Sequence, residues 1–301
     1  MKPFLMIRVL VALVAAIATA SRCEAQLRTG HAIPGYHGLE VGQAPKFGLS
    51  YQNITTFYSA STQTDRNGDS VGSGSISVLT NHNTITYMSP WLFMGGNLVM
   101  RATVPLTNAE PNPFSTSITS DGVGLGDIYL QPLSVYWEGR HHKVTFGYAY
   151  WLDNGSFSAD SNDNLGKGFD THEASLGMTY YPTKALDWHM SILGRYELHG
   201  SVDGADIEPG QNVVVDWSVG KHLDERWNVG AVGYGVWQTS SEKGTEGNGD
   251  EGYYGTAALG GEVRYAKPEW EGDITVRALY EFNSFNRPEG QFLYVGFNIG
   301  F

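Results

Sequence analysis

The last residues, Gln291-Phe-Leu-Tyr-Val-Gly-Phe-Asn-Ile-Gly-Phe301, alternate between two sets of side chains up to the end of the chain. Counting back by twos from the terminus gives Phe301, Ile299, Phe297, Val295 and Leu293. Because successive side chains of a strand point to opposite faces, this period predicts a strand with one continuous apolar face. A water-soluble domain more often ends in a polar, poorly ordered tail.

The same period of two recurs along most of the chain. Within residues 143–152, KVTFGYAYWL, every second side chain is a large apolar one, and residues 188–199 and 273–282 repeat the pattern. Alternation over so many residues indicates long strands with one apolar face. We predict twelve strands, at about 46–64, 72–90, 96–106, 126–138, 142–153, 169–182, 186–200, 211–223, 227–240, 252–266, 271–285 and 290–301.

The segments between these strands alternate in length. One set is short, namely 91–95, 139–141, 183–185, 224–226 and 267–270. The other set is mostly long and rich in Gly, Ser, Asn and Asp, namely 65–71, 107–125, 154–168, 201–210 and 241–251. Short turns at one end and long loops at the other are typical of barrels in the bacterial outer membrane. The sequence therefore predicts an all-β, antiparallel, up-and-down transmembrane barrel with short periplasmic turns and long extracellular loops.

The N-terminus has the layout of a secretory signal peptide. Lys2 and Arg8 precede a short apolar run at residues 9–18, and small residues follow at Ala20 and Ala25. This pattern predicts a cleaved leader, with cleavage after either alanine and Ala25 preferred. The predicted organisation is a signal peptide at 1–25, an N-terminal periplasmic or plug segment at 26–45, and an outer-membrane barrel at 46–301. The only cysteine, Cys23, would be lost with the leader.

Composition and charge agree with this assignment. Charged residues make up only 17% of the 301 residues, while glycine is abundant at 38 and aromatic residues reach 13%. Removing residues 1–25 takes away a net charge of +2, so the charge falls from −12 to −14. A chain this acidic does not offer the basic surface that nucleic acids require. The apolar run at residues 9–18 is too short for a transmembrane helix, and no longer one follows it.

The last strand also carries information about assembly. A lipid-facing sheet has to close on itself because lipid offers no hydrogen bonds, so the final strand is expected to pair with the first. The terminal Phe301, with Ile299 and Phe297 before it, resembles the C-terminal signature of Gram-negative outer-membrane proteins. That resemblance implies recognition by the barrel assembly machinery, and the apolar face implies contact with outer-membrane lipid.

The opposite face of the strands predicts the lining of the lumen. Charged or polar side chains occupy inward positions on most strands, at Arg101, Asp127, Gln131, Glu173, Arg195, Glu197, Asp216, Glu262, Arg264, Asp273, Arg277 and Glu281. Such side chains tune selectivity in a wide pore, or they pair and fill the interior of a small barrel. Both roles remain open at this point. Trp151, Tyr181, Tyr254, Phe292 and Tyr294 are also expected to point inward.

The sequence gives less support to a catalytic role than to a channel role. His189, Ser191 and His199 lie on one strand face, but neighbouring positions there are about 7 Å apart, too far for direct proton transfer. His141 and His142 are neighbours in a short turn and point to opposite faces, so they do not form a metal pair. We therefore predict no catalytic residues, no metal and no cofactor, with a lipid-modifying barrel enzyme as the least favoured alternative.

Two stretches carry a family resemblance. Residues 31–51, HAIPGYHGLEVGQAPKFGLSY, and residues 122–137, GVGLGDIYLQPLSVYW, are similar to the outer-membrane proteins of the meta-pathway phenol-degradation family. The resemblance implies a channel or transporter for passive passage of small, aromatic or hydrophobic compounds. The alternative is a structural or adhesion-type barrel without transport. Cargo identity, direction and oligomeric state stay open.

The segment at 26–45 allows two interpretations. It contains Gly30, Pro34, Gly35, Gly38 and other breakers that exclude it from the barrel wall. It either folds into the periplasmic mouth, with Glu40 contacting Arg101 or Arg277, or forms a loose periplasmic tail.

Overall fold

The computed structural model describes residues 29–301, apart from 43–44, 46, 110–121 and 160–163. The predicted signal peptide at 1–25 lies outside the described residues. Within the described part of the chain, no helix is both long and apolar enough to cross a membrane. The regular structure consists almost entirely of antiparallel strands, with two short 3-10 helices, η1 (Gly249–Gly252) and η2 (Pro268–Trp270).

Twelve long strands form the wall, and a thirteenth, β4, has two residues and pairs only with β3. Eleven of the long strands run β1 to β3 and β5 to β12, and the last is β13. Their bounds are β1 Gly48–Thr64, β2 Ser70–Phe93, β3 Gly96–Ala109, β4 Gly124–Leu125, β5 Tyr129–Glu138, β6 His142–Trp151, β7 Thr171–Tyr180, β8 Trp188–His199, β9 Asn212–His222, β10 Trp227–Gln238, β11 Gly255–Lys267, β12 Gly272–Phe285 and β13 Pro288–Gly300. Each long strand coincides with a predicted one to within a few residues.

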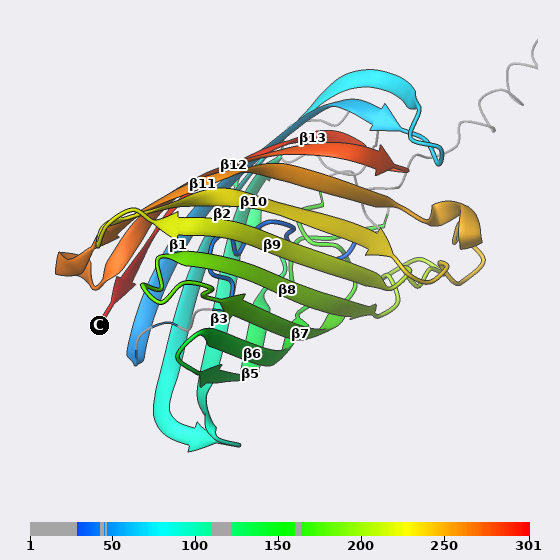
Figure 1. Cartoon of the computed structure of the whole chain (residues 1–301). Helices are drawn as coiled ribbons and strands as arrows, with labels where there is room; N and C mark the ends of the chain where they lie inside the picture. The colour runs from blue at the N-terminus through cyan, green and yellow to red at the C-terminus, as the bar shows by residue number, and fades with distance from the viewer. Residues whose placement is uncertain (1–28, 43–44, 46, 110–121, 160–163) are drawn as a thin grey trace, which may run out of the picture.

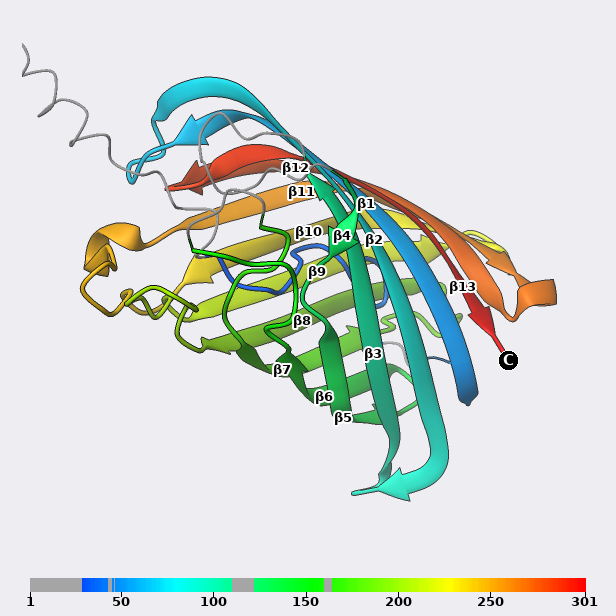
Figure 2. The same cartoon turned by 180° about the vertical axis from the view of Figure 1, so that it is seen from behind.

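The sheet closes into a barrel (Figures 1 and 2). Each long strand pairs with the next along the chain, and β13 pairs antiparallel with β1, with Ile299 opposite Tyr51. The backbone N–H of Phe301 donates to the carbonyl of Leu49 at 2.9 Å, so pairing continues to the last residue. The expectation that the final strand pairs with the first is confirmed.

The two ends of the barrel differ. At one end, which we call the short-turn end, the connections are residues 94–95, 139–141, 181–187, 223–226 and 268–271. The other end, the long-loop end, carries residues 152–159, 164–170, 200–211 and 239–254, together with the shorter connections 65–69 and 286–287. β1 begins and β13 ends at the short-turn end, so the C-terminus lies there (Figure 1).

The wall is apolar outside and polar inside. On β12, Ile274, Val276, Tyr280 and Phe282 are exposed, whereas the alternating Arg277 is buried, as are its neighbours two residues away on either side. β7 and β8 show the same strict alternation of buried and exposed residues. This outward band of large apolar side chains is the surface that lipid would cover. The predicted outward orientation of the β12 side chains is confirmed.

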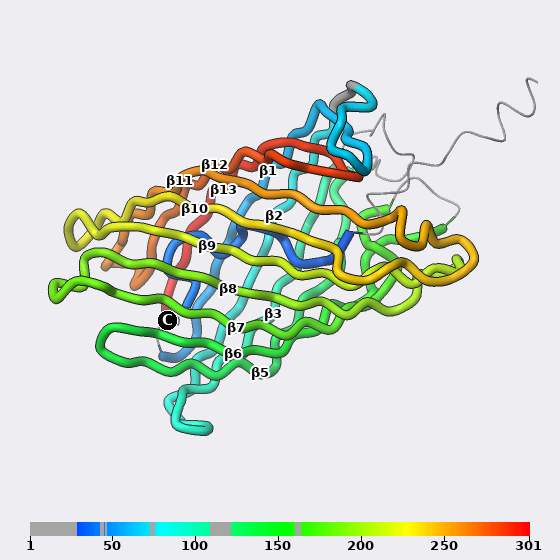
Figure 3. Tube along the Cα trace, turned by 45° about the vertical axis from the view of Figure 1, so that its right-hand side comes forward, coloured from blue at the N-terminus to red at the C-terminus, as the bar shows by residue number. Residues whose placement is uncertain are grey.

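The chain ahead of β1 lies inside the barrel. Residues 29–42 form an irregular stretch of backbone, drawn in blue, that runs within the lumen (Figure 3). We call residues 29–42 the lumen segment. Over the long-loop end, Phe169, Val202 and Ile207 form a small buried cluster between two loops. The barrel interior therefore contains both wall side chains and a piece of backbone.

Candidate functional site

The lumen segment extends along the barrel from one end to the other. At its start, the Lys167 ammonium, from a long loop, donates to the carbonyl of Thr29 at 2.6 Å. At its end, the N–H of Gly42 donates to Thr179 Oγ1 at 3.0 Å, one residue before β7 ends at the short-turn end. The segment is therefore not confined to one mouth, but passes through the lumen before entering β1.

Carboxylates of the wall bind the backbone amides of this segment. A buried N–H that lacks a strand partner needs another acceptor, and an ionised carboxylate is a strong one. Three wall carboxylates serve in this way: Glu197 accepts from the N–H of Ala32 at 2.7 Å, Asp216 from that of Gly35 at 2.7 Å, and Glu262 from that of Leu39 at 3.1 Å.

Guanidinium groups of the wall bind the carbonyls of the same segment. Arginine suits this role because it carries several donors in a fixed planar arrangement. Three wall arginines contribute: Arg195 donates to the carbonyl of Ile33 at 3.0 Å, Arg277 to those of Gly35 and Tyr36, and Arg264 to that of Leu39 at 2.9 Å. The irregular backbone is therefore satisfied by side chains of opposite charge.

Two of these acids, Asp216 and Glu262, pair with the three arginines. Arg195 lies 2.8 Å from Asp216, and Arg277 Nε lies 2.6 Å from Glu262, with all four side chains almost completely buried. Arg264 adds a second contact to Glu262 at 3.0 Å. Each of these five charges has both an ionic partner and a backbone partner, the condition under which buried charges are tolerated.

At the long-loop end, Asp127 connects the lumen segment to the loops. Its carboxylate lies 3.0 Å from His31 Nε2 and accepts from the N–H groups of Gly155 and Lys167, both at 2.8 Å. The other ring nitrogen of His31 lies 2.8 Å from Thr171 Oγ1. Burial lowers the pKa of the Lys167 ammonium to about 8, against the attraction of Glu197 and Asp127. The long loops are thus fastened to the segment through one carboxylate.

At the short-turn end, Glu40 has several polar partners. It accepts hydrogen bonds from the Tyr181 hydroxyl at 2.6 Å and from the Asn228 amide at 2.8 Å. His222 Nε2 lies 3.2 Å from Glu40 Oε1, and Arg264 lies 3.9 Å from Oε2. The expected contacts of Glu40 with Arg101 or Arg277 were wrong, because the strand register places Arg264 beside it.

The twelve predicted lumen positions divide into two groups by exposure. Nine are buried, namely Asp127, Gln131, Glu173, Arg195, Glu197, Asp216, Glu262, Arg277 and Glu281, while Arg101, Arg264 and Asp273 are partly exposed. Among those that contact the lumen segment, Arg195 pairs with Asp216, and Glu262 pairs with both Arg264 and Arg277. Glu281 belongs to a separate set, in which Tyr58, Tyr234 and Arg287 donate to its oxygens.

Several polar residues that organise the interior were not among the predicted positions. Arg287, which pairs with the buried Glu281 at 2.8 Å, falls in a two-residue turn whose inward orientation has no periodic signal. His31 and Glu40 precede the first strand and follow no period. Asn228 and His222 lie on strands, so the alternation of side chains along β10 and β9 could have identified them as inward positions.

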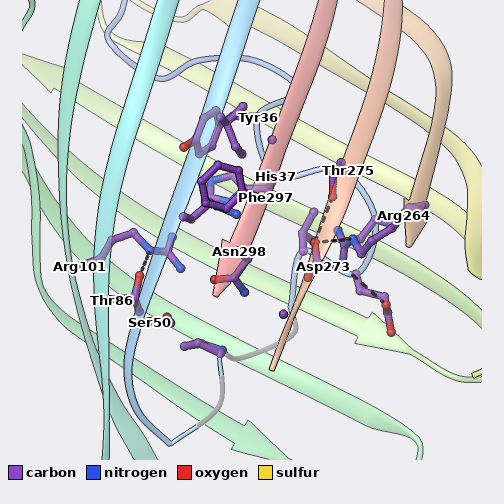
Figure 4. Close-up of a pocket in the computed structure, with 18 of the residues that line it drawn as sticks. Tyr36, His37, Ser50, Thr86, Arg101, Arg264, Asp273, Thr275, Phe297 and Asn298 are labelled. Carbon is purple, nitrogen blue, oxygen red and sulfur yellow. Dashed lines mark hydrogen bonds and ion pairs between the residues drawn. The ribbon is translucent and has the colours of Figure 1, made fainter. Parts of the chain in front are cut away.

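A cavity of about 500 Å³ lies between the lumen segment and the wall. All six labelled residues that follow line this cavity. In Figure 4, Arg101 and Thr86 lie on the left and Arg264 and Asp273 on the right, with Tyr36 and His37 of the segment between the two pairs. Residues of the short turns, including Arg226 and Pro268, also line it. Its lining contains none of the described residues of the long loops, so the cavity extends from mid-barrel toward the short-turn end.

The hydroxyl and imidazole groups considered for catalysis are engaged elsewhere. Ser191 Oγ lies 2.9 Å from Thr179 Oγ1, and His189 Nε2 lies 2.8 Å from Asn228 Oδ1. Thr171 Oγ1 lies 2.8 Å from both His31 and His199, but Thr171 is fully buried and out of reach of a substrate. This geometry gives no support to a nucleophile activated by a base.

Comparison with known proteins identifies the fold and the family. The family model described as "Putative MetA-pathway of phenol degradation" matches residues 60–297. The chain is similar to the COG4313 outer membrane channel from Pseudomonas putida F1, with a TM-score of 0.73 and 13% identity over 90% of this chain and 100% of that chain. The translocator domain of autotransporter NalP from Neisseria meningitidis aligns with a TM-score of 0.51 and 11% identity, over 86% and 90% of the two chains. No curated protein matches the chain.

Proposed function

Because the chain belongs to the family of the MetA pathway of phenol degradation and folds as an outer-membrane barrel, we propose that it is a channel for passive passage of small aromatic compounds. The match over residues 60–297 confirms the family expected from the sequence. The likeness to solved barrels establishes the outer-membrane fold, whereas transport and cargo are our proposal.

The observation that carries the proposal is the polar cavity inside a closed membrane barrel. The wall presents paired charges to the lumen, and the cavity beside the lumen segment reaches the short turns. The lumen segment, which occupies part of the barrel interior beside the cavity, contributes no strand to the wall. A barrel with only a structural role has no need for a polar cavity at its centre.

Arg101 supports an aromatic cargo with a hydroxyl or carboxylate group. It lines the cavity together with Tyr36 and Tyr129, and its Nε donates to Thr86 at 3.4 Å. Among the described residues, no carboxylate lies within ion-pairing distance of Arg101. A guanidinium binds an anionic oxygen and also stacks on an aromatic ring, so a phenolate or benzoate satisfies both preferences.

Flux into liposomes tests this proposal. The purified protein should carry benzoate faster than benzylamine, and Arg101→Gln should reduce benzoate flux by about tenfold or more, the loss of one charge-assisted hydrogen bond. Arg66→Gln, a change at an exposed loop residue, is the matched control and should leave flux unchanged. Equal flux with and without protein for both solutes would favour the structural alternative.

We also propose that residues 1–25 are a cleaved leader and that the short-turn end faces the periplasm. The apolar run at 9–18, the small residues before position 26 and the terminal Phe301 at that end support this orientation. The mass of the protein purified from outer membranes should correspond to a chain that begins at Gln26. The engagement of Ser191 with Thr179 and of His189 with Asn228 agrees with the proposed channel role.

A further inference from the structure

We propose that the short-turn end of the lumen contains a zinc-binding site formed by Glu40, His189 and His222. Glu40 belongs to the lumen segment, His189 to β8 and His222 to β9. One ligand atom from each residue lies within 4.8 Å of the other two. Two imidazoles and one carboxylate are a combination that zinc binds, with water or a carbonyl oxygen as a fourth ligand.

Two of the three ligand atoms are already at the separation that a metal requires. Zinc bonds of about 2.0–2.2 Å in a tetrahedral arrangement put neighbouring ligand atoms about 3.4 Å apart. Glu40 Oε1 and His222 Nε2 are separated by 3.2 Å. Only His189 has to move closer, and its ring centroid lies 5.3 Å from that of His222.

His189 provides independent evidence for a ligand. Its side chain is completely buried, and Nε2 lies 2.8 Å from Asn228 Oδ1. Its Nδ1 is buried and has no hydrogen-bond partner among the described residues. A buried ring nitrogen without a partner is unfavourable, and coordination of the ion through Nδ1 would satisfy it while Nε2 keeps its hydrogen bond to Asn228.

The charged side chains around the proposed site carry a net negative charge. Glu40, Glu262 and Asp273 form a connected group with two guanidiniums, those of Arg264 and Arg277. Three carboxylates against two guanidiniums leave one negative charge in excess. Arg264, the closest cation to Glu40 at 3.9 Å, is shared with Glu262 and Asp273 and does not neutralise Glu40 alone.

A bound ion would have a mechanical consequence. Because Glu40 lies on the lumen segment and the two histidines lie on the wall, zinc would fasten the segment at the short-turn end. At the other end, His31 and Asp127 already do so. Zinc should therefore lower the conductance of the barrel, a consequence that rests on the proposed channel function, whereas binding itself does not.

The test measures Zn²⁺ binding to the full-length protein in detergent by competition with a chromophoric chelator. We expect one Zn²⁺ per chain, with affinity lowered by about tenfold or more in His189→Gln and in His222→Gln, the loss expected at a metal ligand. His142→Gln, an exposed histidine at the same end of the barrel, is the matched control and should bind as the original protein does.

Folding of every variant is checked by heat-modifiable migration. If the histidine variants fail to fold, Glu40→Gln provides the same test from the lumen segment, outside the wall. Stoichiometric binding that is weakened by any of these three changes and not by His142→Gln supports the site. The absence of one-to-one binding to the folded original protein, or equal binding by all folded variants, overturns it. A zinc-independent conductance with intact zinc binding would contradict only the fastening of the segment or the channel function.

Discussion

The two ends of the described chain are held in the barrel in different ways. β13 is held by backbone pairing to β12 on one side and β1 on the other, residue after residue. The lumen segment is held by individual side chains of the wall that bind its N–H and carbonyl groups. β13 therefore needs only a period of two, whereas the segment needs particular side chains at particular depths.

This difference determines which part of the molecule is able to move. Removing β13 would expose a whole row of unpaired backbone groups to lipid, which is prohibitive. Each contact of the lumen segment can instead be exchanged for a hydrogen bond to water, at a net cost of about 1.5–3 kcal/mol for a bond to a charged side chain. The segment is therefore the part whose displacement would open the lumen without disturbing the wall.

The largest expected effect is on the wall. Val276→Arg puts a charge on the outward face of β12, where Val276 is exposed among other apolar side chains. It should destabilise the folded barrel by about 2–4 kcal/mol if the site lies near the bilayer midplane. Denaturant titration in liposomes measures the change. Val71→Arg, at an exposed position near the loop between β1 and β2, is the control and should have less than half that effect.

Wild-type stability for Val276→Arg would show that this face does not meet lipid. The comparison between wall and segment would then lose its basis, because β12 would no longer be a membrane strand.

A smaller effect is expected on the segment. Gly38 has φ +63°, and a Cβ there would lie 1.8 Å from Glu262 Oε2 and 2.1 Å from Arg277 Nη2. Gly38→Ala should therefore disfavour the seated segment by at least about 1–2 kcal/mol, the strain of a left-handed residue alone. Protease cleavage within residues 29–42 should become faster, while the barrel keeps its heat-modifiable migration.

Gly95→Ala is the matched control for that experiment. Gly95 also has a positive φ, +78°, but a Cβ there would meet nothing within 4 Å. It lies in the turn between β2 and β3, so it should not change cleavage of the segment. Equal cleavage rates for Gly38→Ala and the original protein would show that the segment is not held as described.

The smallest effect on stability is expected at the terminus. Phe301 is 75% exposed, so Phe301→Ser should change the stability of the folded barrel by less than about 0.5 kcal/mol. We expect its amount in the outer membrane to fall nevertheless, because we propose that the assembly machinery recognises the terminal aromatic residue. Quantitative blotting of membrane fractions measures the amount, and normal levels would contradict that role.

The same contrast explains what the sequence could predict. Strand positions, inward and outward faces and the pairing of β1 with β13 follow from a local period and from the need to close the sheet. The two-residue β4 has no such period and was not predicted. The course of the lumen segment was not predicted either, because its partners are distant in sequence, with Thr171 lying 140 residues from His31.

The site divides in the same way. Eleven of the twelve predicted positions lie on periodic strands, whereas Asp127 lies in the loop just before β5. The partner of Glu40 could not, since it depends on the depth of β11 relative to a segment without a period. The grouping of Glu40, His189 and His222 likewise depends on three elements that meet only in the folded barrel.

The central claim is that the lumen segment obstructs an otherwise continuous lumen. It is tested most directly by single-channel conductance of a variant lacking residues 29–42, compared with the original protein in the same planar bilayer. We predict discrete steps of clearly higher conductance for the variant, with unchanged heat-modifiable migration of the barrel. Identical conductance of the two folded proteins would contradict the claim, because it would show that removing the segment opens nothing.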